Sequence, residues 1–165
     1  MKTWFQLADR QHRGFIDDKE LQIFLSTDDR IFSLRTVHLL MYDITNTNIR
    51  KLGIKEFSAL VHSIMNWKEI FERVDRNRSR NIDSSKLQEA LLTLGCTVPP
   101  VILDLLVSNF AESGGDKKTI EYDSFIGCCL TVKRLQEKLR EKDTNHNGSA
   151  TFTCESFIST VLYLL

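Results

Sequence analysis

Asp9–Glu20 reads D-R-Q-H-R-G-F-I-D-D-K-E, a largely polar run that contains Ile16 and is followed directly by Leu21. A pair of apolar residues five positions apart recurs four more times, at Leu52/Phe57, Ile82/Leu87, Ile120/Phe125 and Phe152/Phe157. Ahead of each polar run lies a further apolar residue: Phe5, Leu39, Phe71, Val107 and Leu139, at spacings of 34, 32, 36 and 32 residues. Self-similarity at such a period indicates one supersecondary unit repeated five times.

Two further polar runs share the pattern of Asp9–Glu20. Asp75–Lys86 reads D-R-N-R-S-R-N-I-D-S-S-K, and the fifth run opens D-T-N-H-N-G at Asp143. In the 12-residue calcium loop of an EF-hand, positions 1, 3, 5, 7, 9 and 12 supply oxygen ligands and position 6 is Gly. The sequence therefore predicts an all-α fold: an EF-hand array of five helix–loop–helix units, with about eight helices and short paired loop strands.

Two long helices are expected to be shared between neighbouring units. Apolar residues at three- and four-residue steps predict one helix from Lys55 to Val74 and another from Ser124 to Lys142. Each leaves one loop and leads into the next, so no room remains for a flexible tether. We expect one domain over 1–165, with hands near 1–25, 34–66, 66–95, 100–130 and 124–165.

Composition limits the classes of function. The 22 basic and 22 acidic residues balance, which argues against a nucleic-acid binder, since such proteins usually carry a basic excess. No apolar run is long enough for a transmembrane segment. The four cysteines form no C-x-x-C pair, so we expect free thiols and a cytoplasmic or nuclear location. No nucleophile–base pair or phosphate loop stands out, so an enzyme is not expected.

The first loop, residues 9–20, keeps the most complete set of calcium ligands. Arg13 at position 5 cannot coordinate, and it places a cation near the ion unless it swings outward. We predict a weak Ca²⁺ site, with Mg²⁺ competing, at Asp9, Gln11, the Phe15 carbonyl, Asp17 and Glu20.

The third loop, residues 75–86, keeps its outline without its anchoring ligand. Arg80 replaces the turn Gly, and Lys86 stands where a bidentate Glu is needed. We therefore interpret the loop as vestigial. Its remaining ligand-type residues are Asp75, Asn77, Ser79 and Asp83.

The other loops are poorer still. The second loop offers no carboxylate between Asp43 and Glu56, and the fourth runs from Ala111 to Ser124 without either anchoring carboxylate, so neither should bind. The fifth loop has Asp143, Asn145 and Asn147 at positions 1, 3 and 5. It is either a weak metal site or a solvated loop.

An odd number of hands leaves one loop strand without a partner, and an open strand edge favours association. The last segment of the chain is also apolar almost throughout. We predict a homodimer or heterodimer through the fifth hand, with an interface of Phe152, Phe157, Val161, Leu162, Leu164 and Leu165. The alternative is that this segment folds back onto its own lobe.

The chain resembles the penta-EF-hand family, which includes sorcin, grancalcin and the EF-hand domains of calpain, and most of all its plant-type members. The segments that carry the resemblance are Trp67–Ile82, Phe125–Asp143 and Gly148–Leu164. The resemblance implies pairing of hand one with two and three with four, dimerisation through hand five, and apolar grooves that take partner peptides. Family members usually carry a Gly/Pro-rich N-terminal extension, which is not seen here and fits a fragment or a truncated product.

Three functions fit these observations. The first is a calcium-binding adaptor of weak affinity that dimerises. The second is a calcium-insensitive interaction scaffold, and the third is a regulatory subunit of an enzyme, as the resemblance to calpain suggests. We favour the first, because the first loop keeps both anchoring carboxylates.

Overall fold

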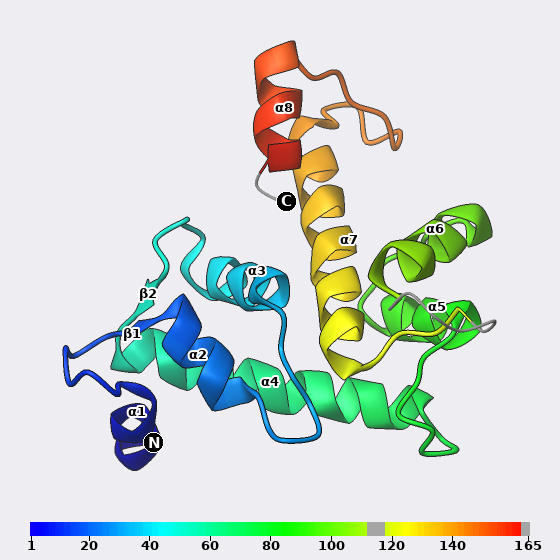
Figure 1. Ribbon diagram of the computed structural model, residues 1–165. Helices are drawn as coiled ribbons and strands as arrows, with labels where there is room; N and C mark the ends of the chain where they lie inside the picture. Colours follow the sequence, from blue (N-terminus) through cyan, green and yellow to red (C-terminus); the bar gives the residue numbers. More distant parts are fainter. Residues whose placement is uncertain (112–117, 163–165) are drawn as a thin grey trace.

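The structure is a computed structural model that describes residues 1–111 and 118–162. Within these ranges it contains eight helices and one short two-stranded sheet, which confirms the predicted all-α EF-hand fold. The start of the long helix α7 packs against the second half of the other long helix, α4 (Figure 1). The helices are α1 Lys2–Ala8, α2 Asp18–Leu25, α3 Leu34–Thr45, α4 Ile54–Val74, α5 Ser84–Thr93, α6 Pro100–Phe110, α7 Tyr122–Lys142 and α8 Cys154–Leu162.

Loop strands join the first four hands in pairs. Strands β1 (Ile16–Asp17) and β2 (Lys51–Leu52) are antiparallel, with Ile16 opposite Leu52. In the other pair Ile82 and Ile120 form an isolated bridge, with reciprocal N–H···O=C distances of 2.8 and 2.9 Å. Loop one thus pairs with loop two, and loop three with loop four. The described residues of the fifth loop pair with no other strand.

Helix starts follow from local capping. The side chain of Asp17 accepts the backbone N–H of Glu20 at 2.9 Å, and Glu20 accepts the N–H of Asp17 at 3.1 Å, which forms a capping box at α2. Asp83 accepts the N–H of Lys86 at 2.9 Å at the start of α5. Pro100 is the first residue of α6, where its missing N–H has no partner to lose.

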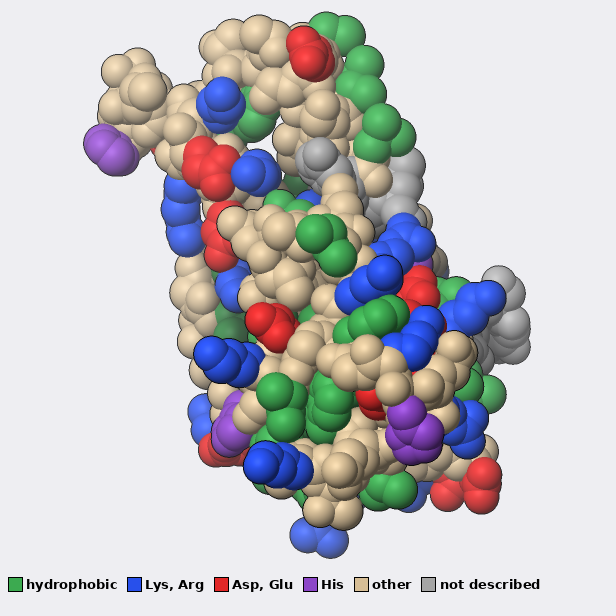
Figure 2. All heavy atoms as spheres, turned by 90° about the vertical axis from the view of Figure 1, so that its left-hand side faces the viewer, with side chains coloured by type: hydrophobic (Ala, Val, Ile, Leu, Met, Phe, Trp, Pro, Cys, Tyr) green, Lys and Arg blue, Asp and Glu red, His purple; other side chains and the backbone are tan. Residues whose placement is uncertain are grey.

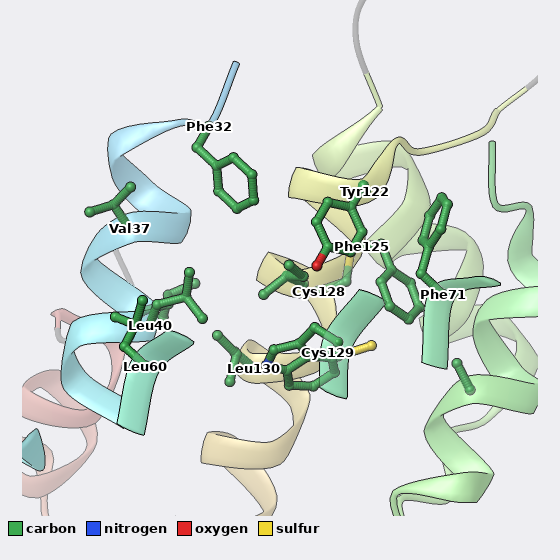
Figure 3. Close-up of a cluster of buried hydrophobic side chains, with 14 of the residues drawn as sticks. Phe32, Val37, Leu40, Leu60, Phe71, Tyr122, Phe125, Cys128, Cys129 and Leu130 are labelled. Carbon is green, nitrogen blue, oxygen red and sulfur yellow. The ribbon is translucent and has the colours of Figure 1, made fainter. Parts of the chain in front are cut away.

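The repeated apolar pairs form most of the core. Four of the five pairs are no more than 1 % exposed: Ile16/Leu21, Leu52/Phe57, Ile82/Leu87 and Ile120/Phe125. Around Phe125, side chains from α4 and α7 pack edge to face, with ring centroids 5.3 Å apart for Phe71–Phe125 and for Phe71–Tyr122 (Figure 3). The fifth pair differs, because Phe152 is half-buried and Phe157 is 58 % exposed.

The second and fourth hands interlock where α3 meets α7. Thr36 Oγ1 donates to the Asp123 carbonyl at 3.3 Å, and Tyr122 donates to the Ile64 carbonyl of α4 at 3.0 Å. Gly127 permits this approach, because a Cβ there would lie 2.9 Å from a Phe110 ring carbon and 3.0 Å from Thr36 Oγ1. Direct packing, rather than a linker, joins the two halves.

The four cysteines are free thiols, and three of them, Cys96, Cys128 and Cys129, are buried. Burial raises the pKa of the Cys128 thiol to about 12, so it stays protonated at neutral pH. Cys154, in contrast, is exposed at the start of α8.

None of the described helices has the length and apolar character needed to span a bilayer. On the face formed by the first two hands, acidic and basic side chains are interspersed (Figure 2).

Candidate functional site

Loops one, three and five are closed in the same way by the carboxylate at position 1. In each loop this buried Asp accepts the backbone N–H groups of positions 5 and 6. The acceptors and donors are Asp9 with Arg13 and Gly14 (2.9 and 2.7 Å), Asp75 with Ser79 and Arg80 (3.1 and 2.8 Å), and Asp143 with Asn147 and Gly148 (3.1 and 2.7 Å). The three loops therefore keep the EF-hand outline, whatever their ligand chemistry.

In the first loop, Arg13 turns inward and occupies the space between the acidic side chains. Its Nη2 donates to Asp17 Oδ2 at 2.6 Å and to Glu20 Oε2 at 2.7 Å. The guanidinium also lies 4.5 Å above the centroid of the Phe15 ring. Two of the three carboxylates that the sequence assigns to the metal, Asp17 and Glu20, are thus bound to a cation of the chain itself.

This ion pair is stable across the physiological pH range. The hydrogen bond from Arg13 holds the pKa of the Asp17 carboxyl below its ordinary value of 3.8, with the backbone N–H of Glu20 adding to the effect. The hydrogen bond to Asp17 in turn raises the pKa of Arg13 further. Both groups therefore stay charged.

The first loop has the right donor types for Ca²⁺ in an arrangement that a cation already fills. Asp9, Asp17 and Glu20 supply hard carboxylate oxygens, and Phe15 contributes position 7. Gln11 donates its backbone N–H to Glu20 Oε1 at 3.3 Å. In the part of the chain that the structure describes, no three His, Cys, Asp or Glu side chains converge as a metal site. The residues fit calcium once the Arg13 side chain leaves.

The third loop also contains its own cation, supplied from a different position. Lys86 Nζ lies 3.1 Å from Asn77 Oδ1, 3.4 Å from Asp75 Oδ1 and 3.4 Å from the Asn81 carbonyl. These oxygens belong to positions 3, 1 and 7, which would face a calcium ion. The Asn81 carbonyl was missed by sequence reasoning, although its position 7 in the loop could have identified it.

The other predicted ligands of the third loop have internal roles. Ser79 Oγ donates to Asp75 Oδ1 at 2.8 Å, and Asp83 caps α5. Burial alone would raise the pKa of Asp75, but the hydrogen bonds from Ser79, Arg80 and Lys86 outweigh it and lower that pKa. Without a carboxylate at position 12 this donor set does not fit Ca²⁺.

The backbone of the third loop holds two arginines in the left-handed region. Arg78 has φ +52°, and at the same loop position His12 has φ +53° and His146 +52°, so this conformation belongs to the loop itself. Arg80 has φ +63° where Gly14 and Gly148 have φ +80° in the other two loops. Only Arg80 is therefore strained by the identity of its side chain.

The remaining loops offer little to a metal. Asp43, the one carboxylate early in the second loop, forms an ion pair with Lys133 of α7 at 2.9 Å. Residues 112–117 of the fourth loop lie outside the described residues. In the fifth loop Asn145 is exposed, and Asn147 Oδ1 accepts the N–H of Ser149 at 3.0 Å. The weak site predicted there remains a prediction.

The predicted dimer surface lies on α8, at the end of α7 that is far from α4 (Figure 1). Phe157 is 58 % exposed, Val161 37 % and Leu162 62 %, so these side chains are not buried in their own lobe. Ile158, which was not among the predicted residues, is 48 % exposed beside them. Leu164 and Leu165 lie outside the described residues.

Comparison with known proteins gives related sequences over almost the whole chain, although no family model matches it. It is 61 % identical over 161 residues to "Calcium-binding protein CBP" of rice (Oryza sativa subsp. japonica), covering 98 % of this chain and 55 % of the relative. It is 38 % identical over 162 residues to "Probable calcium-binding protein CML48" of Arabidopsis thaliana, covering 96 % and 71 %. It is 32 % identical over 158 residues to human peflin, covering 95 % and 55 %. The chain spans about half the length of the curated relatives to which it is 60 to 61 % identical.

A solved structure has the same fold. The structure of a homolog of programmed cell death 6 protein from Leishmania major Friedlin superposes with a TM-score of 0.75 and 26 % identity, covering 99 % of this chain and 93 % of that one. The repeat of five hands, the shared helices α4 and α7 and the pairing of the first four loops agree with these relationships. The chain belongs to the penta-EF-hand family.

Proposed function

We propose that this chain is a calcium-binding adaptor of weak affinity, with its main metal site in the first loop. The observation that carries the proposal is the binding of two loop carboxylates, Asp17 and Glu20, to one cation, the Arg13 guanidinium, while Asp9 accepts the backbone N–H of the same residue. The names of the relatives, which include calcium-binding proteins from two plants, support it. Because the carboxylates of the first loop already bind a cation, we expect a metal ion to bind at the same position.

The weak affinity follows from competition. To bind, Ca²⁺ must displace a guanidinium held by two carboxylates at 2.6 and 2.7 Å, and it gains no oxygen from position 5. We therefore expect a dissociation constant of roughly 10⁻⁴–10⁻³ M, as in weak calcium modules. Mg²⁺ is expected to compete, because few ligands distinguish the two ions in so incomplete a site.

Calorimetric titration of the metal-free chain with CaCl₂, and separately with MgCl₂, tests this proposal. The expected result is one weak calcium site, whose apparent affinity for calcium is lower when magnesium is present. Sub-micromolar calcium affinity would overturn the claim of competition by Arg13. No heat at millimolar calcium would overturn the calcium-binding role itself.

A calcium-insensitive scaffold is the second candidate, and Lys86 favours it. This side chain satisfies three oxygens of the third loop, and Arg13 satisfies the carboxylates of the first. Two loops can therefore keep their closed shape with no metal. In this case the chain would hold its partners at all calcium concentrations.

In either case the adaptor is proposed to dimerise through the fifth hand and to act by binding rather than by catalysis. The exposed apolar face of α8 and the described backbone of the fifth loop, which pairs with no other loop, support this. The second subunit is either another copy or a related chain, and partner peptides would occupy an apolar groove. The free cysteines support a cytoplasmic or nuclear location.

A further inference from the structure

A cleft of about 850 Å³ opens beside the third loop, where the C-terminal end of α4 faces the α2–α3 connection and the start of α7. We call it the loop-three cleft. Five basic side chains line it: Arg30, Lys68, Arg76, Arg78 and Arg80. A smaller hollow of about 300 Å³ continues from it and shares Arg30, Phe71, Arg80 and Tyr122 with it.

Three of these cations form no ion pair within the part of the chain that the structure describes. Lys68 lies 3.8 Å from Glu72, and Arg76 forms an ion pair with Glu89. Arg30, Arg78 and Arg80 form no ion pair with any carboxylate of residues 1–111 or 118–162. The other acidic group in the wall, Asp75, points into the loop and is hydrogen-bonded there to Ser79, Arg80 and Lys86.

The floor of the cleft is aromatic. The Arg30 guanidinium lies 4.6 Å above the centroid of the Tyr122 ring, and this ring packs edge to face against Phe71. Both rings are held firmly, since Tyr122 is 5 % and Phe71 6 % exposed. Figure 3 shows the two rings together, one from α7 and one from α4. An apolar floor beneath unneutralised guanidinium groups suits a ligand that is both anionic and partly apolar.

The third loop keeps an arginine at a position where glycine would fit without strain. Arg80 has φ +63°, and it lines both the cleft and the adjoining hollow. Strained residues that the surrounding structure keeps in place are concentrated at binding sites. The strain alone identifies no ligand, but it coincides here with an unneutralised guanidinium in a cleft.

We propose that the loop-three cleft binds an acidic segment of a partner protein, a peptide that carries Asp or Glu next to aromatic or aliphatic side chains. The proposal rests on the adaptor function above and names the chemistry of its partner. Concavity favours a peptide over a lipid surface, because the basic side chains line a cleft that a flat bilayer would not enter. The third loop thus becomes a site for carboxylates instead of a site for calcium.

Fluorescence anisotropy with a short labelled peptide of glutamate and phenylalanine tests the proposal on the whole chain. The variant is Arg78→Asn with Arg80→Gly, because both new residues tolerate positive φ. We expect it to bind the peptide roughly tenfold more weakly or worse. The matched control is Lys2→Gln with Lys55→Gln, which removes the same charge at exposed positions outside the cleft and should bind as the native chain does.

Three results would overturn the proposal. The first is equal binding of a peptide with glutamine in place of glutamate, and the second is unchanged binding by the double arginine variant. The third is sedimentation of the native chain with phosphatidylserine vesicles while the peptide does not bind. Each titration is made in chelator and in calcium, next to calorimetry of the same sample, so loss of the calcium role is seen separately from loss of the peptide site.

Discussion

Arg13 Nη2 lies 2.7 Å from Oε2 of Glu20, the carboxylate that should close the first loop around a metal ion. In the third loop, Lys86 Nζ lies 3.4 Å from Oδ1 of Asp75, the carboxylate at position 1. The two cations come from positions 5 and 12, yet each reaches the acidic centre of its loop. A side-chain cation is therefore bound within both loops, among residues at positions that bind the metal ion in a calcium-loaded EF-hand.

Removing the cation of the first loop should tighten calcium binding. Arg13→Asp eliminates the competing guanidinium and adds an oxygen at position 5, so we expect at least a roughly tenfold lower dissociation constant by calorimetry. Arg10→Asp is the control, since it changes the charge of the same loop by the same amount at an exposed position that does not coordinate. If both variants gain equally, net charge and not displacement of Arg13 limits the affinity.

The third loop should stay empty at millimolar calcium and become a site only after two changes. Lys86→Glu supplies the bidentate ligand and removes the ammonium from Asn77 and Asp75, while Arg80→Gly relieves the turn at φ +63°. We expect an additional calcium site in the double variant and little in either single variant. A calcium ion found in the native third loop by crystallography would contradict this.

Acid should weaken the first loop through Asp17. The pKa of Asp17 in the folded chain lies below 3.8. As the pH falls, Asp17 is therefore protonated at a higher pH in the unfolded chain than in the folded one. The contribution of ionised Asp17 to the stability of the folded chain is fully present above pH 3.8. It is lost as the pH falls through the lower pKa that Asp17 has in the folded chain. In Arg13→Met this contribution is reduced, and urea unfolding at neutral and acidic pH should show a smaller loss for the variant than for the native chain. If the native chain and Arg13→Met lose the same stability on acidification, Arg13 does not set the pKa of Asp17.

Substitution of Phe157 and Leu162 by Asp should produce a monomer. The two side chains are 58 % and 62 % exposed on α8, and their burial in a dimer would contribute about 25 cal/mol per Å² of apolar surface. Leu7→Asp with Ile31→Asp is the control, because these residues are 67 % and 76 % exposed but lie in the first hand and the α2–α3 connection. Light scattering decides the outcome. A native chain that is already monomeric would refute the dimer, and a dimer lost in chelator would make the fifth loop a working metal site.

Gly127→Ala should destabilise the fold. The new Cβ would lie 2.9 Å from the Phe110 ring and 3.0 Å from Thr36 Oγ1, so α7 would have to move away from α3 and α6. Overpacking of this kind costs about 1–3 kcal/mol, measurable as a lower urea midpoint. Adding Phe110→Leu should recover part of the loss. If the urea midpoint does not rise in the double variant, contact with the Phe110 ring is not what destabilises Gly127→Ala.

Much of the fold was predictable because the apolar repeat is regular. The long helices were predicted to begin at Lys55 and Ser124, and they begin at Ile54 and Tyr122. The small differences arise because the helices start directly after Gly53 and Glu121, whose extended backbones cap them. The fifth hand was harder to predict, since apolar periodicity does not distinguish a face that packs in its own lobe from one left exposed.

The contacts within the first loop could not be predicted from the sequence. Sequence showed that Arg13 cannot coordinate a metal, but an arginine at position 5 can point outward as well as inward. The inward orientation depends on the reach of the guanidinium to Asp17 and Glu20 and on the Phe15 ring beneath it. The loop-three cleft was not foreseen, because Arg30 reaches it from the α2–α3 connection, which is distant in sequence from the third loop.

The sharing of α4 and α7 between neighbouring hands has a consequence for regulation. Helix α4 leaves the second loop and ends at Val74, directly before Asp75 of the third loop. Any movement of α4 on ion binding to the paired first and second loops would therefore also move one wall of the loop-three cleft. Such linkage is reciprocal: if calcium alters the affinity for an acidic peptide by some factor, the peptide must alter the affinity for calcium by the same factor. If the coupling is favourable, the weak metal site would bind calcium more tightly while the acidic peptide is bound. The protein would then respond to calcium and its partner only when both are present.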